Sequence, residues 1–201
     1  MLRERQPLGA CKISKGSRKQ YMFIKEAQRE IRSVFFGGFV GQLIAGIIWA
    51  LSAAVSTWGT ARLGMAVLFF VSMLLFPLTQ FILKLIRRPV KLSAENTLNQ
   101  LAMQIAFTVP IGFLLVGAAT LYRENWFYPA SMVVVGAHYL PFIFLYGMPQ
   151  FGILAGLLIA GGIGIGLYEP NVFSLGGWIS AIVLIIFAFI GRSVILREDG
   201  S

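Results

Sequence analysis

Six long apolar stretches run along the chain, each followed by a polar connection or tail. A helix needs about 20 apolar residues to cross ~30 Å of hydrocarbon, and each stretch approaches that length. In lipid, a helix or a closed barrel is needed to satisfy the backbone N–H and C=O groups, and the sequence lacks the short alternating segments of a barrel. The pattern predicts an all-α polytopic membrane protein, a six-transmembrane-helix bundle over residues 34–195. The predicted spans are 34–57, 63–84, 99–121, 126–147, 149–168 and 173–191.

The segment before the first span combines two patterns. Residues 1–20 are polar and rich in Lys and Arg, which predicts a basic, disordered cytoplasmic leader. Within residues 21–33, Ile24, Ala27 and Ile31 fall on one helical face and charged residues on the other. This is typical of an amphipathic interfacial helix, so the expected partner is the lipid bilayer, with anionic lipid at the basic leader. No nucleic acid is expected, because a basic leader is what fixes topology during insertion.

Positive charge is distributed unevenly over the connections. Of the 17 Lys and Arg residues, only Arg62 and Arg123 fall on one side of the predicted membrane. Because the cytoplasmic side carries the excess of Lys and Arg, both termini are predicted to be cytoplasmic. Trp and Tyr favour the headgroup region. Those at the predicted outer ends are Trp58, Tyr122, Trp126, Tyr128, Tyr168 and Trp178.

The spans lack the groups that several function classes require. None of the 17 basic or eight acidic residues lies inside a span, apart from the boundary residue Lys84. Carboxylate-coupled transport and intramembrane hydrolysis need such acids, and the sequence has no GxSxG motif. No enzymatic activity is therefore expected. Cys11, the single cysteine, cannot form an internal disulfide or a zinc site with one distant histidine, so no metal and no cofactor is expected.

Polar side chains inside the spans are concentrated in the predicted cytoplasmic half. At ~1.5 Å per residue, Gln42 lies about 12 Å from the inner end of its span, and Thr108 and His138 about 13 Å. We predict a cytoplasm-facing pocket between the first four spans. Its candidate ligand-binding residues are His138, Gln42, Gln80, Gln104, Thr108, Tyr139 and Pro141. The alternative is that these groups only cross-link helices, through hydrogen bonds of ~0.6 kcal/mol each.

His138 is the only side chain within the spans that titrates near neutral pH. One interpretation is a structural hydrogen bond to Gln104, to Gln42 or to a carbonyl freed by Pro141. A second is the sensing of a ligand or a proton, and a third is ligation of a metal or haem. Catalysis is not expected, because no carboxylate near in sequence could orient the imidazole.

Small residues recur at four-residue spacing in the first and fifth spans. The predicted helix-packing glycines are Gly37, Gly41, Gly152, Gly156 and Gly164. Such spacing lets helix backbones approach closely, either inside one bundle or in a possible homo-oligomer. Pro77, Pro110 and Pro141 lie inside the second, third and fourth spans. Each removes an intrahelical hydrogen bond, which permits a bend.

Three segments together resemble a known family. They are EAQREIRS before the first span, FPLTQFILKLI at the end of the second, and VGAHYLPFIFLYGM in the fourth. Over residues 26–195 the chain resembles an uncharacterised family of small six-span bacterial integral membrane proteins. The resemblance implies a multi-pass protein of the bacterial cytoplasmic (inner) membrane. It draws attention to His138 and names no substrate.

Two functions are compatible with these features. The first is binding or passage of a small neutral or weakly polar ligand through the cytoplasm-facing pocket. The second is a non-transporting structural or regulatory module that self-associates or packs on a partner through glycine-rich helix faces. A water-accessible cavity lined by Gln42, Gln104 and His138 would favour the first. Mutual hydrogen bonds among those side chains, with a glycine-rich face buried between chains, would favour the second.

Overall fold

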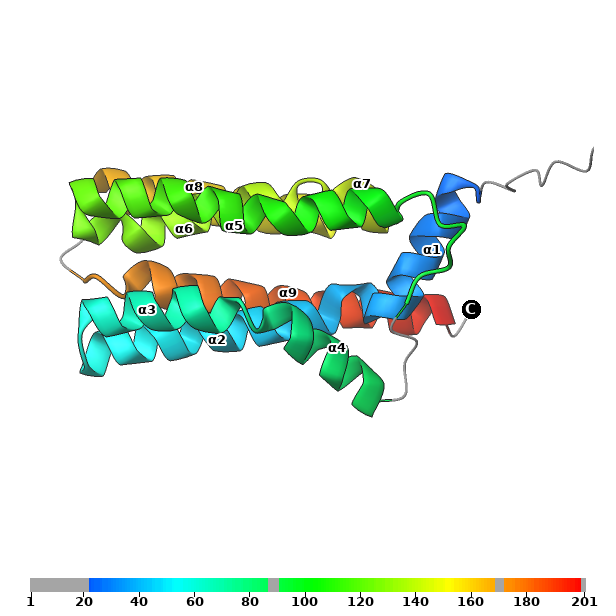
Figure 1. Cartoon of the computed structure of the whole chain (residues 1–201), viewed down its shortest axis with the longest axis horizontal. Helices are drawn as coiled ribbons and strands as arrows, with labels where there is room; N and C mark the ends of the chain where they lie inside the picture. The colour runs from blue at the N-terminus through cyan, green and yellow to red at the C-terminus, as the bar shows by residue number, and fades with distance from the viewer. Residues whose placement is uncertain (1–21, 87–90, 169–171, 200–201) are drawn as a thin grey trace, which may run out of the picture.

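The computed structural model describes residues 22–86, 91–168 and 172–199, and all regular structure in these ranges is helical (Figure 1). The predicted leader, residues 1–20, lies outside the described residues. The helices are α1 (Ile24–Phe35), η1 (Phe36–Gly38), α2 (Phe39–Trp58), α3 (Ala61–Ser72), α4 (Leu75–Leu85), α5 (Asn99–Tyr122), η2 (Glu124–Trp126), α6 (Phe127–Tyr139), α7 (Phe142–Tyr146), α8 (Gln150–Tyr168) and α9 (Leu175–Asp199).

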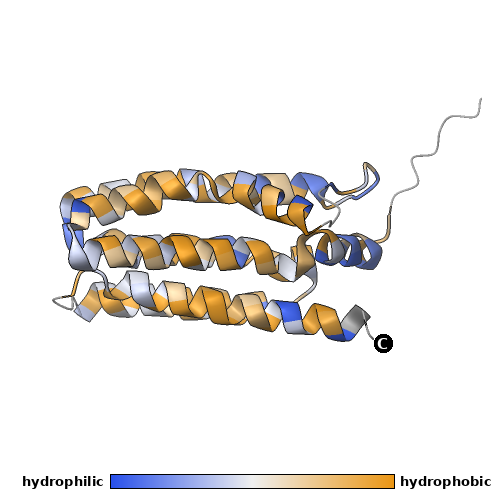
Figure 2. Ribbon diagram, turned by 90° about the horizontal axis from the view of Figure 1, so that it is seen from below, coloured by the Kyte–Doolittle hydropathy of each residue, from blue (hydrophilic) through white to orange (hydrophobic). Residues whose placement is uncertain are grey.

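Five helical segments are long and apolar enough to cross a membrane, and the bent pair α3 and α4 is a sixth candidate. The second and fourth predicted spans are each divided, into α3 with α4 and α6 with α7. Apolar residues predominate along the helices of the bundle, and strongly polar residues are concentrated near the helix ends (Figure 2). Leu114 and Leu115 are 74% and 71% exposed, which suits contact with lipid better than contact with water. The fold is therefore all-helical and has the spans of a small membrane protein.

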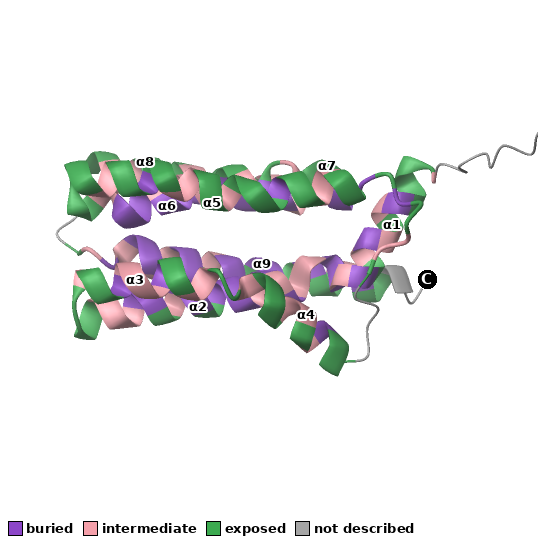
Figure 3. Cartoon of the chain, viewed as in Figure 1, coloured by how far each residue is buried: buried purple, intermediate pink, exposed green. Residues whose placement is uncertain are grey.

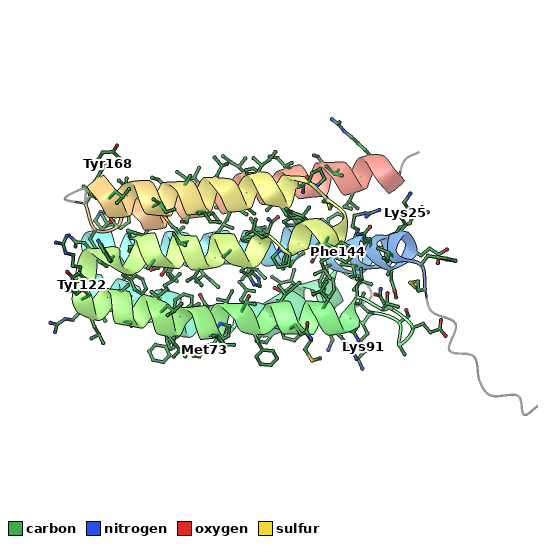
Figure 4. The ribbon with its side chains drawn as sticks, turned by 90° about the horizontal axis from the view of Figure 1, so that it is seen from above. Lys25, Met73, Lys91, Tyr122, Phe144 and Tyr168 are labelled. Carbon is green, nitrogen blue, oxygen red and sulfur yellow. The ribbon has the colours of Figure 1, made fainter. Side chains whose placement is uncertain are left out.

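The spans form two layers (Figures 1 and 4). In one layer α2 lies between α3 and α9, and in the other α6 lies between α5 and α8. Contacts of α9 with α6 and α8 join the layers. Buried residues are concentrated on the helix faces that meet inside the bundle, and exposed residues cover the outside (Figure 3). The helices α2 and α6 carry three of the six buried polar residues in the described ranges: Gln42, Ser52 and Ser131.

The two ends of the bundle differ in composition (Figure 4). Lys25 on α1 and Lys91 lie at one end, together with the C-terminal part of α9. We call this the basic end. Tyr122 and Tyr168 lie at the opposite end, which we call the aromatic end. Both tyrosines are strongly exposed there, as expected for side chains at the headgroup level.

A sharp corner separates α1 from the first span. Phe36, Gly37 and Gly38 have φ angles of 51°, 61° and 81°, in the left-handed region that glycine tolerates best. A Cβ on Gly37 would also lie 2.7 Å from Ile195 Cγ1 of α9, so no larger residue fits without a shift. As a result α2 begins at Phe39 and not at residue 34. The apolar pattern continues through the corner and does not reveal it.

Two of the three interior prolines coincide with helix breaks. Pro77 lies in the first turn of α4, which is bent by 54° from α3. Pro141 separates α6 from α7, where the Leu140 N–H donates to the Ala137 carbonyl at 3.2 Å. That carbonyl would otherwise accept from residue 141, so the tight turn satisfies it locally. Pro110 lies inside the unbroken helix α5.

Candidate functional site

Two glutamines near the basic end, one buried and one half-buried, have buried polar atoms without a partner among the described residues. Gln42 of α2 is 3% exposed and its Oε1 accepts no hydrogen bond. Gln150, the first residue of α8, has a buried Nε2 that donates none. A Cβ on Gly191 of α9 would lie 3.8 Å from Gln42 Oε1, and 3.1 Å from both Gln150 Nε2 and the Gly37 carbonyl oxygen. We call these four residues the polar junction.

Local backbone features place the junction at this point. Gly191 has no side chain, which leaves the space that the two amides approach. Gly147, with φ of 65°, ends α7 in the left-handed conformation and turns the chain towards α8. Pro149 then precedes Gln150 at the start of α8, where its missing N–H removes no helical hydrogen bond.

The polar junction suits an uncharged polar group. A buried polar atom without a partner costs about 1–3 kcal/mol. A hydroxyl or amide group could accept from Gln150 Nε2 and donate to Gln42 Oε1, and a water molecule could do the same. The junction contains no carboxylate and no imidazole. Among the described residues, no three His, Cys, Asp or Glu side chains come together as a metal site.

His138 has a partner on the neighbouring helix. Its Nδ1 lies 2.9 Å from Thr108 Oγ1, which in turn lies 2.7 Å from the Ile105 carbonyl oxygen. Thr108 has a single hydroxyl hydrogen, which it donates to that carbonyl. With that hydrogen on the Ile105 carbonyl, the tautomer of His138 that fits has Nδ1–H as the donor to Thr108 and Nε2 as the acceptor nitrogen. The partner is therefore a threonine of α5, and not either glutamine or the freed carbonyl suggested by the sequence.

Aromatic rings surround the break at Pro141. We call the following residues the aromatic cluster: His138, Tyr139, Phe142, Tyr146 and Phe151. The ring centroids of His138 and Phe142 lie 5.0 Å apart, and those of Tyr139 and Phe151 stack at 6.1 Å. Offset and edge contacts of this kind favour a fixed arrangement of the rings. His138 is thus held between Thr108 and an aromatic wall.

The structure separates residues that depth along the spans had grouped into one pocket. Gln42 belongs to the polar junction, whereas Gln104 is exposed on α5 and Gln80 is half-buried on α4. Within the described residues, no hydrogen bond joins any of these glutamines to His138 or to another of them. Depth fixes how far a side chain lies along the membrane normal but not the direction in which its helix turns it. A single vestibule lined by all of them is therefore not what the fold contains.

Two surface hollows lie away from the predicted pocket residues. One, of about 410 Å³, lies at the basic end and is lined by Glu26, Arg29, Glu30, Ser33, Val34 and Lys91. The other, of about 440 Å³, is apolar and lies between α3 and α5, with Met65, Phe69 and Phe113 in its lining. Neither is lined by His138 or by a glutamine.

A buried network missing from the sequence prediction lies towards the aromatic end. The hydroxyl oxygen of Tyr128 lies 2.6 Å from Ser52 Oγ and 2.9 Å from Ser56 Oγ, and Ser52 donates to the Gly64 carbonyl at 2.8 Å. We call Ser52, Ser56 and Tyr128 the hydroxyl cluster. Tyr128 is the second residue of α6, but its ring is fully buried against Gly177 and does not face the surroundings as the exposed Tyr122 and Tyr168 do. The four-residue spacing of Ser52 and Ser56, which places both on one face of α2, is the sequence signal that could have indicated the hydroxyl cluster.

The predicted helix-packing glycines differ in their surroundings. A Cβ on Gly152 would meet a neighbour at 3.0 Å and one on Gly41 at 3.8 Å. Nothing in the described residues lies within 4 Å of a Cβ on Gly156 or Gly164, so these two do not pack inside the bundle. Their part in self-association stays a prediction. The close approaches of α2 to α9 and of α6 to α8 instead use Gly46, Gly136 and Gly162.

Most of the chain matches one protein family. Residues 24–193 match the profile of a family of unknown function, DUF7010. The chain belongs to this family. The DUF7010 match extends from α1 into α9, so it includes the polar junction and both clusters. The resemblance inferred from the sequence, to an uncharacterised family of small membrane proteins, is thereby confirmed. No curated protein and no solved structure matches the chain.

Proposed function

We propose that this DUF7010 protein binds a small neutral polar molecule at the polar junction. The observation that supports this function is the pair of complementary amide atoms, Gln42 Oε1 and Gln150 Nε2, buried beside Gly191 with no partner among the described residues. Native proteins satisfy most buried polar atoms, so two such atoms at one point need a physical explanation. A ligand with one donor and one acceptor supplies it.

We further propose that the basic end faces the cytoplasm of a bacterial inner membrane and that the ligand enters from this side. Excess Lys and Arg marks the cytoplasmic side of membrane proteins, and α1 and the end of α9 lie at the basic end. The junction is close to it, because Gly37 and Gln150 stand at the starts of their spans. No chemical step is proposed, since the junction offers no acid, base or nucleophile.

Solute uptake by proteoliposomes tests the proposed function. Liposomes containing the full chain are exposed to a gradient of glycerol, urea or acetamide, and swelling is followed by light scattering. We expect faster swelling than in empty liposomes for at least one of these probes, and a loss of the difference in Gln42→Leu. Gln100→Leu, the same change at an exposed position of α5, should leave swelling as in the unmodified chain.

Thermal unfolding in detergent with the same probes separates binding from passage. A rise in melting temperature with one probe that Gln42→Leu removes supports binding, even without uptake. Absence of both effects, with Gln42→Leu still folded, would show that the junction holds only water and would overturn the proposed function.

Cysteine labelling tests the proposed orientation independently of the ligand. In a Cys11→Ser background, a cysteine at Arg123 should react with a membrane-impermeant maleimide added to intact cells, and one at Lys91 should not. The opposite pattern would reverse the orientation while leaving the polar junction untouched.

A non-transporting, self-associating module is the second candidate. It is favoured by Gly156 and Gly164 of α8, because no described residue lies within 4 Å of a Cβ built on either of them. Ala160, between these two glycines, is exposed. If α8 forms a homo-oligomer, Gly156→Leu should reduce cross-linking between copies in liposomes. If uptake persists in that variant, passage does not depend on the oligomer.

A further inference from the structure

The hollow at the basic end has two basic side chains and a hydroxyl in its lining. Arg29 and Ser33 lie four residues apart on α1 and therefore share one face, and Lys91 reaches the same hollow from the connection before α5. The structure gives neither Arg29 nor Lys91 an ion pair within the described residues. Two basic side chains thus line an open volume of about 410 Å³, together with the acidic residues Glu26 and Glu30.

The two acidic residues of the same hollow each accept hydrogen bonds from neighbouring groups of the chain. Glu30 accepts hydrogen bonds from the Ser93 N–H at 2.7 Å, from the Ser93 hydroxyl at 3.0 Å and from Asn96 Nδ2 at 2.7 Å. Burial alone would raise the pKa of the Glu30 carboxyl, but the hydrogen bonds from Asn96 and Ser93 outweigh it and lower the pKa below its ordinary value. Glu26 Oε2 accepts from the Phe23 N–H at the start of α1.

Contacts on both sides of α1 fix the position of the hollow. Asn96 Nδ2 donates to the Ala27 carbonyl at 3.2 Å, which ties the helix to the connection before α5. On the other side, Arg32 Nη1 donates to the Tyr146 carbonyl at 2.7 Å. Ile31, fully buried, fills the space beneath. These contacts hold the backbone of α1 beside the connection before α5, and the Arg29 and Lys91 side chains extend from it as exposed groups.

The start of α1 has the exposed apolar side chains that suit a position at a membrane surface. Phe23 and Ile24 are 77% and 52% exposed, although the helix carries five charged residues and continues into the first span. An amphipathic helix with bulky apolar groups on its surface is stabilised in the headgroup region of a bilayer. A phosphate group on a lipid would be presented to the hollow at this level.

We propose that this hollow is a binding site for the phosphodiester group of an anionic membrane lipid. Arg29 provides a planar fork that can bond two phosphate oxygens, Lys91 provides a point charge, and Ser33 provides a hydroxyl donor. Val34 forms an apolar part of the lining. The site is separate from the polar junction and is independent of the neutral ligand proposed for it.

Native mass spectrometry of the full chain in detergent tests the proposal. Phosphatidylglycerol and phosphatidylcholine are added in turn, and the fraction of protein carrying lipid is measured. We expect tighter binding of phosphatidylglycerol, and a loss of about 30-fold in that affinity in the double variant Arg29→Gln/Lys91→Gln, at about tenfold per 1.4 kcal/mol and ~1 kcal/mol per basic residue.

A matched double variant separates a defined site from general charge. Lys84→Gln/Arg197→Gln removes two exposed basic residues of the same end that do not line the hollow, and it should keep the preference for phosphatidylglycerol. Equal losses in both double variants, or equal binding of the two lipids by the unmodified chain, would overturn the proposal. Displacement of the lipid by millimolar inorganic phosphate would also overturn it, by showing that the site binds soluble phosphate. Melting temperatures within a degree of the unmodified chain confirm that each variant is folded.

Discussion

Helix α2 carries two buried polar groups, Gln42 in the polar junction and Ser52 in the hydroxyl cluster, and their surroundings are opposite. Ser52 is fully buried and bonded both to Tyr128 and to a backbone carbonyl. Gln42 is equally inaccessible, yet its Oε1 has no partner among the described residues. A satisfied network stabilises the helix packing, whereas an unsatisfied one costs stability until another molecule completes it. Burial of a polar residue in a membrane protein therefore does not by itself indicate a ligand, whereas burial without a partner leaves an atom that a ligand or a water molecule can satisfy.

The largest effect is expected from removing the centre of the hydroxyl cluster. Tyr128→Ala should lower the free energy of unfolding in detergent by about 3–5 kcal/mol, because it deletes a large buried ring and leaves two serines without their partner. Tyr168→Ala, an exposed tyrosine of the same end, should change it by less than ~0.5 kcal/mol. Similar losses in the two variants would show that the cluster is not structural.

A substitution in the polar junction should change the free energy of unfolding in the opposite direction. In the absence of ligand, Gln42→Leu is expected to raise the free energy of unfolding by ~1 kcal/mol, since it removes a buried acceptor that has no partner. Chemical unfolding of the purified protein measures this, with Gln100→Leu as the exposed control. A clear loss of stability in Gln42→Leu would mean that the Gln42 amide is satisfied in the folded protein, and the contrast with Ser52 would disappear.

A smaller effect is expected at the contact between α5 and α6. Thr108→Val removes the acceptor of His138 Nδ1–H and should cost ~0.6 kcal/mol, the typical strength of a hydrogen bond between membrane helices. Thr120→Val is the matched control, because Thr120 also lies on α5 and bonds only to a carbonyl of its own helix in the described structure. Equal stability of the two variants would argue that His138 gains nothing from Thr108.

The smallest expected effect is a pH dependence of the contact between α1 and the connection before α5. The pKa of Glu30 is lowered in the folded protein, so its contribution is complete above the ordinary value of 4.5 and is lost as the pH falls through the folded-state pKa. Amide hydrogen exchange at Ser93 should therefore accelerate as the pH falls below 4.5, after correction for the intrinsic pH dependence of exchange. Glu30→Gln should abolish this change, and Glu95→Gln, on the same connection and exposed, should preserve it.

The sequence predicts six spans and the described residues contain five or six candidates, because apolar length is what qualifies a helix to cross lipid. It does not predict the corner at Gly37, since apolar residues continue through it, nor which prolines break a helix. Pro110 and Pro141 look alike in sequence, yet only the second stands at a break.

The candidate site was harder to predict, because the position of a residue along a span gives its depth in the membrane but not the direction in which its side chain points. Gln42 and Gln104 lie at comparable depths, but α2 is central in its layer and α5 is at the edge of the other. Gln150 was overlooked because it stands at the first residue of a span, where a polar group is ordinary. Only the packing of α8 against α9 reveals that its amide is buried.

The two-layer arrangement also sets an order of assembly. α2 is among the first spans to be synthesised, but its partner α9 is the last, and Thr57 and Ser174, which are hydrogen-bonded, are separated by 117 positions. The face of α2 that contains Gly46 therefore lacks its α9 partner until α9 has been synthesised. The other layer, α5, α6 and α8, is contiguous along the chain and can form earlier. A ribosome that stops after α8 would release a finished layer and an unfinished one, and a polar junction that lacks Gly191.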